Sequence, residues 1–340
     1  MKILTLTLTE RNSQMATLSP ARANWPLLKG IKLVGRGKVR DTYELSETIL
    51  LLVATDGLSI FDFVLNALVS QKGIVLNCMN HFWSEYLGQF DIQTHLLAAG
   101  ARIDEYLPQH LQGNPDLQSR AIVVQKMQMA PVEFIYRSVL TGSAIGSYKK
   151  DCTVCDHQLP PGLQDGDSLP YILDTPTTKA EEGHDENMSF REVRRAYPMQ
   201  TLMGLQIFQI CSNYAQTRGI KLADTKFEFG QDAFSELIGD EIVTPDSSRF
   251  WDFDEWQKSR QEETRKAPNP YDKQLVRAWG LELGINKHDP KRPEDVAWVH
   301  SLKVPDGVID RTNATYQRIF RRLTGFHVQE YLYEKMGLPR

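Results

Sequence analysis

An alternating stretch at residues 219–250, GIKLADTKFEFGQDAFSELIGDEIVTPDSSRF, restricts the fold of this chain more than any other segment. Successive side chains of a strand point to opposite faces, so Lys226 and Glu228 share one face of the first run. A second run, SELIGDEIV, follows the polar segment GQDAF, and the two runs together predict a β-hairpin. If the turn centres on Phe234, Glu228 and Asp240 become direct cross-strand neighbours.

Two carboxylates that face each other across a hairpin repel, so this arrangement requires either a cation or raised pKa values. Mg²⁺ suits it, because this ion takes one or two protein carboxylates and fills its other positions with water and phosphate oxygens. Glu228 and Asp240 are therefore predicted to bind Mg²⁺, with Lys226 beside them. The alternative is a solvated hairpin face that Lys226 neutralises.

The order of the other segments predicts an α+β protein of two lobes with a cleft between them. The first part is β-rich, as in residues 32–61, where alternation is followed by the buried run ILLLVA. We expect an N-terminal arm at residues 1–24, a β-rich lobe at residues 25–119 and a mixed α/β lobe at residues 120–340. The polar segment EYLPQHLQGNPDLQSR suggests the boundary. Helices are expected at residues 73–87, 190–218, 271–283 and 306–323.

Composition excludes several classes of partner. With 340 residues, of which 41% are hydrophobic and 24% charged, the chain has the make-up of an ordinary globular protein. Its net charge of −4 gives no overall attraction to nucleic acid or to an anionic membrane. The longest apolar run, residues 49–54, is too short to cross a bilayer, and the N-terminus lacks the pattern of a signal peptide, so we expect a cytoplasmic protein. The lone C-x-x-C at Cys152 and Cys155 is expected to hold reduced thiols rather than a metal.

The segment GRGKVRD, residues 35–41, predicts an anion-binding turn. Glycines allow backbone N–H groups to approach an anion closely, and Lys38 and Arg40 would then neutralise its charge. The spacing differs from that of a Walker A loop, because no Ser or Thr follows Lys38. A tight hairpin turn with surface charges is the alternative.

Two further segments could bind a substrate. RSVLTGSA places Arg137 ahead of Thr141, Gly142 and Ser143, which together could cradle a monophosphate, although Thr141 or Ser143 could equally cap a helix. The loop TPTTKAEEGHDENMS, residues 175–189, concentrates charged side chains around one histidine that could serve acid–base chemistry. Solvated loops are often as polar, so composition leaves both interpretations open.

Taken together, these segments resemble the phosphoribosylaminoimidazole-succinocarboxamide synthase (SAICAR synthetase) family. The motifs that carry the resemblance occur in the family's order: RGKVRDTYEL, LLVATD, SIFD, TGSA, TPTTKAEEGHDEN, ADTKFEFG, DEIVTPDSSRFW, PYDKQLVR and VPDGVIDRT. They extend from about residue 35 to near the C-terminus, and the layout is similar to that of the longer, yeast-type members.

The resemblance implies an ATP- and Mg²⁺-dependent ligase of de novo purine biosynthesis. Such an enzyme joins the carboxylate of carboxyaminoimidazole ribonucleotide to the amine of L-aspartate through an acyl phosphate, giving SAICAR, ADP and phosphate. The resemblance also implies a β-rich ATP-binding lobe, a second lobe that binds substrate and metal, small-molecule partners only, and a monomer or homodimer.

Carried onto this sequence, the family's motifs assign roles to three groups of residues. The ATP phosphates would be covered by Gly37, Lys38, Val39, Arg40 and, from a strand of the next lobe, Lys126. The catalytic residues would be Lys226, Glu228 and Asp240, of which the two carboxylates would hold Mg²⁺. The substrate-binding residues would be Arg137, Thr141, Gly142, Ser143, Asp246, Arg249 and, from the closing loop, His184, Asp185, Glu186 and Asn187.

The substrate motifs depart from the family pattern, in which an arginine commonly follows the aspartate of ATD. Gly57 stands there, and Ser138 and Val139 replace the usual glycine and aromatic residue after Arg137. An arginine lost from a substrate pocket removes a bidentate clamp, so one alternative is a paralogous ligase that acts on a different nucleotide acid or amine. A nucleotide-binding regulator without catalysis is a second alternative, against which the retained carboxylates argue. A protein kinase is disfavoured, because the chain has no H-R-D or D-F-G motif.

Overall fold

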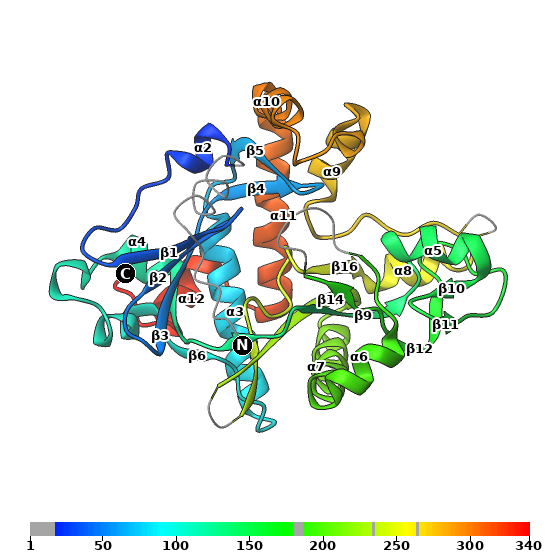
Figure 1. The fold of residues 1–340 in the computed structure, drawn as a ribbon, viewed down its shortest axis with the longest axis horizontal. Coiled ribbons are helices and arrows are strands. Elements are labelled where there is room, and N and C mark those ends of the chain that lie inside the picture. The colour runs from blue at the N-terminus through cyan, green and yellow to red at the C-terminus, as the bar shows by residue number, and fades with distance from the viewer. Residues whose placement is uncertain (1–17, 180–185, 233–234, 263–264) are drawn as a thin grey trace.

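Two antiparallel sheets flank a long helix in the fold of this chain (Figure 1). The computed structural model describes residues 18–179, 186–232, 235–262 and 265–340. The first sheet has five strands in the order β1-β2-β3-β7-β6. Its strands are β1 (Lys32–Arg36), β2 (Arg40–Glu44), β3 (Ile49–Ala54), β7 (Ala121–Gln125) and β6 (Leu96–Ala99).

The first sheet follows the pattern expected from its sequence. In β2, Asp41 and Tyr43 are buried while Arg40 and Thr42 are partly exposed, because alternate residues of a strand face opposite sides. The apolar run of β3 lies in the middle of the sheet, between β2 and β7, where both faces are covered.

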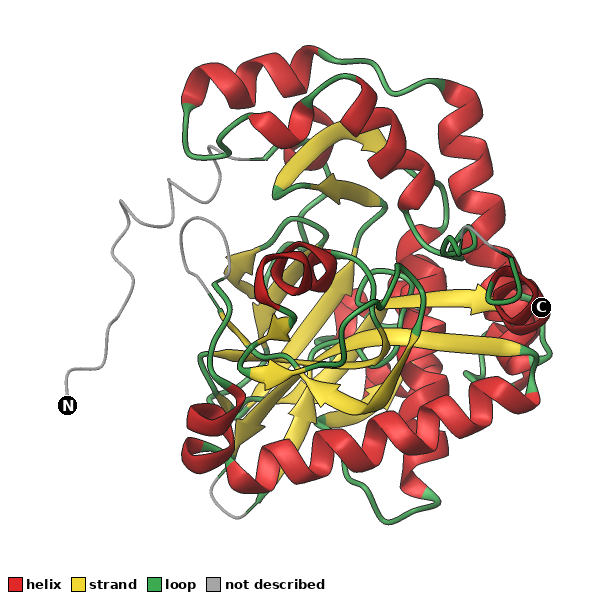
Figure 2. Ribbon diagram, turned by 90° about the vertical axis from the view of Figure 1, so that its right-hand side faces the viewer, coloured by secondary structure: helices red, strands yellow, loops and turns green. Residues whose placement is uncertain are grey.

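The second sheet carries most of the charged motifs. Its central strand is β14 (Ile220–Gln231), which pairs with β9 (Val132–Val139) on one side and with β15 (Glu236–Gly239) and β16 (Ser248–Asp252) on the other. The sheet also includes β12 (Ser168–Asp174), β13 (Thr177–Thr178) and β8 (Gln128–Met129). Helices α6 (Phe190–Ala196) and α7 (Pro198–Thr217) cover it, and Figure 2 shows helices lining the outside of the strands.

Helix α3 (Lys72–Gly88) lies between the two sheets and is buried along most of its length. Asn77 donates to the backbone carbonyls of Ser119 and Ala121 beside the first sheet, while Trp83 donates to the carbonyl of Val243 in the second lobe. Helices α11 (Asp306–Thr324) and α12 (Val328–Glu334) pack against α3 and complete the main core. Because α3 packs against strands of the first sheet and also binds the segment that follows β15, this helix sets how the two lobes face each other.

A separate small core forms around the hairpin of β4 (Gly57–Ile60) and β5 (Phe63–Leu68). Helices α9 (Gln274–Glu282) and α10 (Pro293–Ser301) pack onto it, and the short helix α2 (Pro20–Ala23) lies beside β5 (Figure 1). The remaining elements are α4 (Pro115–Arg120), α5 (Ser143–Asp151), α8 (Phe253–Ser259), β10 (Thr153–Val154), β11 (His157–Gln158) and the 3₁₀ helices η1 (Gly100–Glu105), η2 (Gln109–Leu111) and η3 (Ile285–Lys287).

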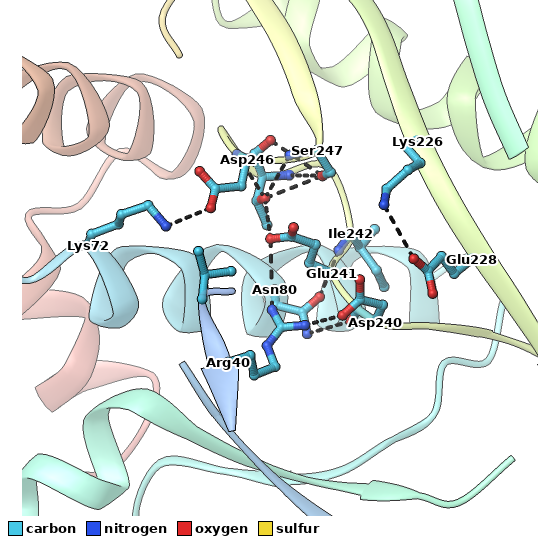
Figure 3. A network of polar contacts seen from close by, with 12 residues as sticks. Arg40, Lys72, Asn80, Lys226, Glu228, Asp240, Glu241, Ile242, Asp246 and Ser247 are labelled. Carbon is cyan, nitrogen blue, oxygen red and sulfur yellow. Dashed lines mark hydrogen bonds and ion pairs between the residues drawn. The ribbon is translucent and has the colours of Figure 1, made fainter. Parts of the chain in front are cut away.

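The predicted hairpin is present, but its predicted register is wrong. Glu228 pairs with Gly239, and Asp240 follows the end of β15 with a left-handed backbone at φ 53°. A shift of one residue would place Asp240 on the opposite face of a regular strand. The left-handed residue ends the strand and changes the direction of the chain, so the carboxylate still comes near that of Glu228 (Figure 3).

The α+β class, the two lobes and the four expected helical regions are confirmed, with the first helix beginning at Lys72. The boundary expected between residues 119 and 120 is wrong, because it separates β7 from the sheet in which β7 pairs with β3 and β6. The expected arm at residues 1–24 is wrong in part, because Ser19 and Arg22 are buried in the first lobe; residues 1–17 lie outside the described residues. Among the described helices, none combines the length and apolarity needed to cross a membrane.

Candidate functional site

An ion pair between Arg40 and Asp240 joins the two lobes. Arg40 is the first residue of β2, and Asp240 directly follows β15. A second nitrogen of Arg40 lies 3.8 Å from Glu241, so the guanidinium faces two neighbouring carboxylates (Figure 3). We call Arg40, Lys226, Glu228, Asp240 and Glu241 the junction cluster.

Glu228 is the buried carboxylate of the junction cluster and has two lysine partners. It accepts from Lys179, and the Nζ atom of Lys226 lies 3.3 Å from its other oxygen. Lys226 is held in turn by Glu133, at 2.6 Å. Burial alone would lower the pKa of Lys226, but the charges of Glu228, Glu133 and Asp240 more than offset burial and raise it, so this lysine is a permanent cation.

Helix α3 positions the turn that carries Asp240. Asn80 of α3 donates to the backbone carbonyl of Asp240 at 3.3 Å and accepts from the backbone N–H of Ile242 at 2.9 Å. Burial would raise the pKa of Asp240, yet Arg40 and Lys226 outweigh burial and lower it, so this carboxyl stays ionised. The pKa of Glu241 is raised instead, because burial and its two acidic neighbours, Asp240 and Asp246, outweigh the attraction of Arg40.

His95 packs beside the junction cluster and was missed in the sequence. A β-carbon on Gly239 would lie 3.4 Å from its Nδ1 atom, and its Nε2 atom is buried without a hydrogen-bond partner among the described residues. Burial lowers the pKa of His95 to about 4, despite the opposing charge of Asp240. The ring is therefore neutral at pH 7 and too weak a base to take up a proton there.

The predicted anion-binding turn is the connection between β1 and β2. The backbone N–H of Gly37 donates to the carbonyl of Arg40 at 2.8 Å, and the half-exposed Lys38 pairs with Asp62 at 2.7 Å. The hairpin alternative is therefore correct as local structure, and the same turn brings Arg40 to the junction cluster. Lys126 lies elsewhere: it pairs with Glu44 at 3.3 Å, at the opposite end of β2 from Arg40.

A polar pocket of about 130 Å³ adjoins the junction cluster within the second lobe. Ligand sites for whole molecules usually measure roughly 300–1,000 Å³, so this pocket suits one end of a ligand. It is lined by Ile135, Arg137, Ser143, Asp224, Thr225, Lys226, Pro245, Asp246, Ser247, Ser248, Arg249, Asp272 and Arg277.

Two arginines predicted to bind substrate converge in the polar pocket. Arg137 and Arg249 both pair with Asp224, the latter at 2.8 Å, and Arg137 also donates to Ser143 at 3.3 Å. Asp224 lies on the same alternating stretch as Lys226, but we assigned it no role. A single buried carboxylate thus fixes two guanidiniums side by side, which leaves an excess of positive charge in the pocket.

Gly142 allows Arg249 to approach the chain closely. Its φ is 62°, and a β-carbon there would lie 2.8 Å from Nη1 of Arg249. Gly142 is also the N-cap of α5, whose first residue is Ser143, and no side chain caps this helix. The alternative that Thr141 or Ser143 caps a helix is therefore wrong, and Thr141 is buried beside the pocket-lining residues.

Asp246 holds together several residues that the sequence did not single out. It pairs with the fully buried Lys72 of α3 at 2.6 Å, accepts from the hydroxyl of Tyr316 on α11, and lies 3.9 Å from Lys273. Burial would raise the pKa of Asp246, but Lys273 and Lys72 lower it well below its usual range. The motif PYDKQLVR contains Lys273, so this residue could have been found there, whereas nothing local marks Lys72.

The predicted closing loop is described only in part. His184 and Asp185 lie outside the described residues. The N–H of Glu186 donates to Thr178 at 3.0 Å, and Asn187 donates to Ser147 on α5 at 3.3 Å. The described end of the loop is thus attached to β13 and α5, the helix whose first residue, Ser143, lines the polar pocket.

A larger cavity lies away from these charged clusters. It is a groove of about 890 Å³ lined by Thr217, Arg218, Ala314, Gln317, Arg318, Arg321, Arg322, Gly325 and His327. Arg218 and Arg322 each donate hydrogen bonds to backbone carbonyls at or near the ends of helices α7 and α11. Both arginines therefore have a structural role as caps of these helix ends. We therefore assign the site to the smaller polar pocket and the junction cluster.

The junction cluster suits a Mg²⁺ ion whose remaining coordination positions are filled by other ligands. Within the described ranges, no group of three or more His, Cys, Asp or Glu side chains has the arrangement of a metal site. Glu228 and Asp240 nevertheless offer hard carboxylate oxygens, and each is neutralised in this structure by lysine or arginine. One or two carboxylates are what Mg²⁺ takes from a protein when phosphate oxygens fill its other positions.

The fold and the site define an enzyme of two lobes that gathers fixed cations and carboxylates where the lobes meet. The family model for SAICAR synthetase matches residues 33–292. The phosphoribosylaminoimidazole-succinocarboxamide synthase of Saccharomyces cerevisiae is 36% identical over 308 residues, which cover 87% of this chain and 95% of that one. The chain therefore belongs to the SAICAR synthetase family.

Two further comparisons agree. The synthase of Thermodesulfovibrio yellowstonii is 38% identical over 303 residues, covering 87% of this chain and 97% of that one. The solved SAICAR synthase of Saccharomyces cerevisiae, complexed with SAICAR, aligns with a TM-score of 0.74 and 33% identity, covering 89% of this chain and 98% of that chain. The resemblance inferred from the motifs is confirmed, and the family is a ligase of purine biosynthesis that uses ATP.

Proposed function

We propose that the junction cluster and the polar pocket form the active site at which this ligase activates a carboxylate with ATP and joins it to L-aspartate. The chain is an ATP-dependent ligase as a member of its family. The carboxylate substrate would be carboxyaminoimidazole ribonucleotide, and the product SAICAR. The paralogous alternative, with a different acid or amine, is not favoured by the comparisons.

The chemistry explains why the site consists mainly of fixed charges. A carboxylate is a poor acyl donor, so its oxygen first attacks the γ-phosphorus of ATP, forming an acyl phosphate and releasing ADP. The amine of aspartate then attacks the acyl carbon, the C–O bond to phosphate breaks, and the amine loses a proton. Both steps gain most from holding the reactants in place and from stabilising the charge that develops.

The connection between β1 and β2, residues 37–39, which we call the glycine turn, would bind the ATP phosphates together with the neighbouring cations. Gly37, Lys38 and Val39 lie in the connection between β1 and β2, and Arg40 already faces anionic groups in the junction cluster. A phosphate chain could replace Asp240 and Glu241 as the partner of Arg40. Lys126, which pairs with Glu44, would contribute only if ATP extended to the far end of β2, and we give it no role in this proposal.

Glu228 and Asp240 would hold Mg²⁺, which would supply positive charge to phosphate and carboxylate oxygens. Lys226 would remain fixed by Glu133 and would provide a permanent cation next to the metal ligands. His95 stays neutral nearby, so it adds no charge to this group at pH 7.

The polar pocket would take the phosphate end of the ribonucleotide. Arg137 and Arg249 are already oriented by Asp224, and Ser143 with the first turn of α5 offers further donors. Asp246, held ionised by Lys72 and Lys273, would orient the same substrate from the other side. Glu186 and Asn187, with His184 and Asp185, would form the closing loop.

The observation that carries this proposal is the Arg40–Asp240 pair, because it joins the glycine turn to the carboxylates predicted to bind Mg²⁺. The test is Glu228→Gln, which removes one negative charge while keeping the shape of the side chain. We expect kcat to fall about 100-fold or more, as for loss of a group that stabilises transition-state charge, and the Mg²⁺ concentration for half-maximal rate to rise.

Glu294→Gln is the matched control, since Glu294 forms an exposed pair with Arg292 on the surface. Both variants should keep the circular dichroism spectrum of the wild type. A Glu228→Gln enzyme with the wild-type rate and the wild-type Mg²⁺ dependence would refute the assignment.

Cellular location and assembly follow from the family alone. We infer a cytoplasmic enzyme, as for purine biosynthesis in general, which acts as a monomer or homodimer. Gel filtration with light scattering distinguishes the two states of assembly.

A further inference from the structure

Helix α2 delivers a fully buried arginine to the glycine turn. One nitrogen of Arg22, Nη2, donates to the carbonyl oxygen of Gly37 at 3.1 Å and to one carboxylate oxygen of Asp41. The other nitrogen, Nη1, donates to the second oxygen of Asp41 at 3.3 Å. The guanidinium thus ties the turn to β2, and its two nitrogens bind both oxygens of Asp41 in a planar fork, a geometry that the single nitrogen of a lysine cannot provide.

The segment around Arg22 is held in place by several independent bonds. Arg36 donates to the backbone carbonyls of Arg22 and Trp25, at 3.0 and 2.8 Å. The N–H of Ala21 donates to Asn66 on β5 at 3.0 Å, which agrees with the position of α2 beside β5 in Figure 1. Because α2 is bonded to β1 through Arg36 and to β5 through Asn66, Arg22 has one defined position.

Gly57 leaves the space that Arg22 fills. A β-carbon at position 57 would lie 3.1 Å from Cδ of Arg22 and 3.1 Å from the carbonyl oxygen of Lys38, closer than such atoms normally approach. In this chain, the guanidinium next to position 57 comes from residue 22, which lies outside the residues matched by the family model.

The bond from Arg22 sets the direction of the peptide between Gly37 and Lys38. In a planar trans peptide the C=O and the next N–H point in opposite directions. Since the carbonyl of Gly37 points to the buried guanidinium, the N–H of Lys38 points away from it, toward the outer side of the turn. A phosphate oxygen bound at the glycine turn would accept a hydrogen bond from this outward N–H.

We propose that Arg22 is a positioning residue for the ATP phosphates, acting through the glycine turn. We also propose that position 57 is glycine because a side chain there would occupy the space that Arg22 needs. The inference rests on the proposed function, because it assumes that the turn binds ATP. Arg22 itself is fully buried and touches no substrate. Its effect is therefore on ATP binding rather than on the polar pocket, where the ribonucleotide would bind.

The test measures KM for ATP, for the ribonucleotide and for aspartate in the full-length chain. Arg22→Met keeps the length of the side chain and removes its guanidinium. We expect KM for ATP to rise about 10-fold or more, as for loss of a hydrogen bond from a charged group, with the other two KM values within about twofold of the wild type. Arg102→Met is the control, because Arg102 forms an exposed pair with Glu105 on the surface of the same lobe.

A second set of variants tests the contact with Gly57. Gly57→Ala should raise KM for ATP when Arg22 is present, because the added methyl group displaces the guanidinium. In an Arg22→Ala background the same change should raise KM for ATP by a clearly smaller factor, because the contact with Cδ of Arg22 is gone while the contact with the carbonyl oxygen of Lys38 remains. If Arg22→Met does not fold, Arg22→Lys takes its place, because a lysine keeps a buried positive charge beside Asp41 but lacks the planar fork of the guanidinium.

Three results would overturn the inference. The first is a folded Arg22→Met or Gly57→Ala enzyme with unchanged KM for ATP. The second is an equal rise in all three KM values, which would indicate a general structural defect. The third is a wild-type chain that consumes no ATP when ribonucleotide and aspartate are present; that result removes the proposed function as well, whereas the first two leave it standing.

Discussion

Lys72 shows at the scale of single residues how the site tolerates buried charge. Its side chain has no exposed surface, yet its ammonium group lies 2.6 Å from Asp246, which also accepts from Tyr316. A buried cation without a partner is very unfavourable, so the pair is stable only while both members are charged. The same reasoning applies to Arg22, whose buried charge is matched by Asp41.

Asp246→Asn should destabilise the folded chain by about 3–5 kcal/mol at pH 7, because it leaves Lys72 buried without its anion. The folded-state pKa of Asp246 is lowered, so its contribution to stability is complete above the ordinary pKa near 3.9 and is lost as the pH falls toward the folded value. The stability difference between wild type and variant should therefore narrow below about pH 4. Urea unfolding at a series of pH values measures the unfolding free energy of both proteins. A difference between wild type and variant that stays constant down to pH 3 would contradict the lowered pKa of Asp246.

Helix α3 is the element that connects the two halves of the site. Lys72 lies at its start and contacts Asp246, and Asn80, about two turns later, binds the backbone on both sides of Glu241. The helix begins where it does because Asp56 accepts from the N–H groups of Gln71 and Gly73, at 3.3 and 2.9 Å. A displacement of α3 would therefore move Asp240 and Asp246 together.

Two glycines of α3 provide a matched test of this role. A β-carbon on Gly73 would lie 2.6 Å from the carbonyl oxygen of Ala54, whereas one on Gly88 would meet nothing within 4 Å. We expect Gly73→Ala to cost about 1–3 kcal/mol through overpacking and to lower activity. Gly88→Ala should change stability by no more than about 1 kcal/mol, in the stabilising direction. Thermal unfolding and turnover of both variants would be measured side by side, and equal effects would contradict the role given to the start of α3.

At the scale of the whole molecule, the first lobe brings cations to carboxylates of the second. The chain passes between the sheets at residues 126 and 127, and the Arg40–Asp240 pair closes the other side. A ligand that binds both the glycine turn and the carboxylates would add to the links between the lobes, which already include this pair and the hydrogen bonds of Asn80 and Trp83. Such a ligand should stabilise the whole fold rather than one sheet.

Mg²⁺ with a non-hydrolysable ATP analogue should therefore raise the melting temperature. At about 100 times the dissociation constant, binding adds about 2.7 kcal/mol, which corresponds to a few degrees for a chain of this size. Addition of EDTA should remove most of the increase, because the carboxylates then face the phosphates without a cation between them. An increase that is unaffected by EDTA, or that persists in Asp240→Asn, would show that the analogue binds independently of the carboxylates.

Local patterns predicted much of this fold and part of its site. The alternation in β14 correctly grouped Lys226 and Glu228, because a strand's two-residue period can be read directly from the sequence. The hairpin register was wrong by one residue, since the left-handed backbone at Asp240 does not follow from alternation. The position of Lys126 relative to the turn also depends on strand order, which no local pattern contains.

By itself, the sequence determined the family, the order of strands and helices, and the residue types available for phosphate and metal binding, because motifs and periodicity are local properties. Only the tertiary structure decided which charges become partners. Arg40 meets Asp240 across 200 residues, and Lys72 meets Asp246 across 174. These pairs form because β2 and α3 meet the segment that follows β15, and burial then requires each charge to find an opposite one.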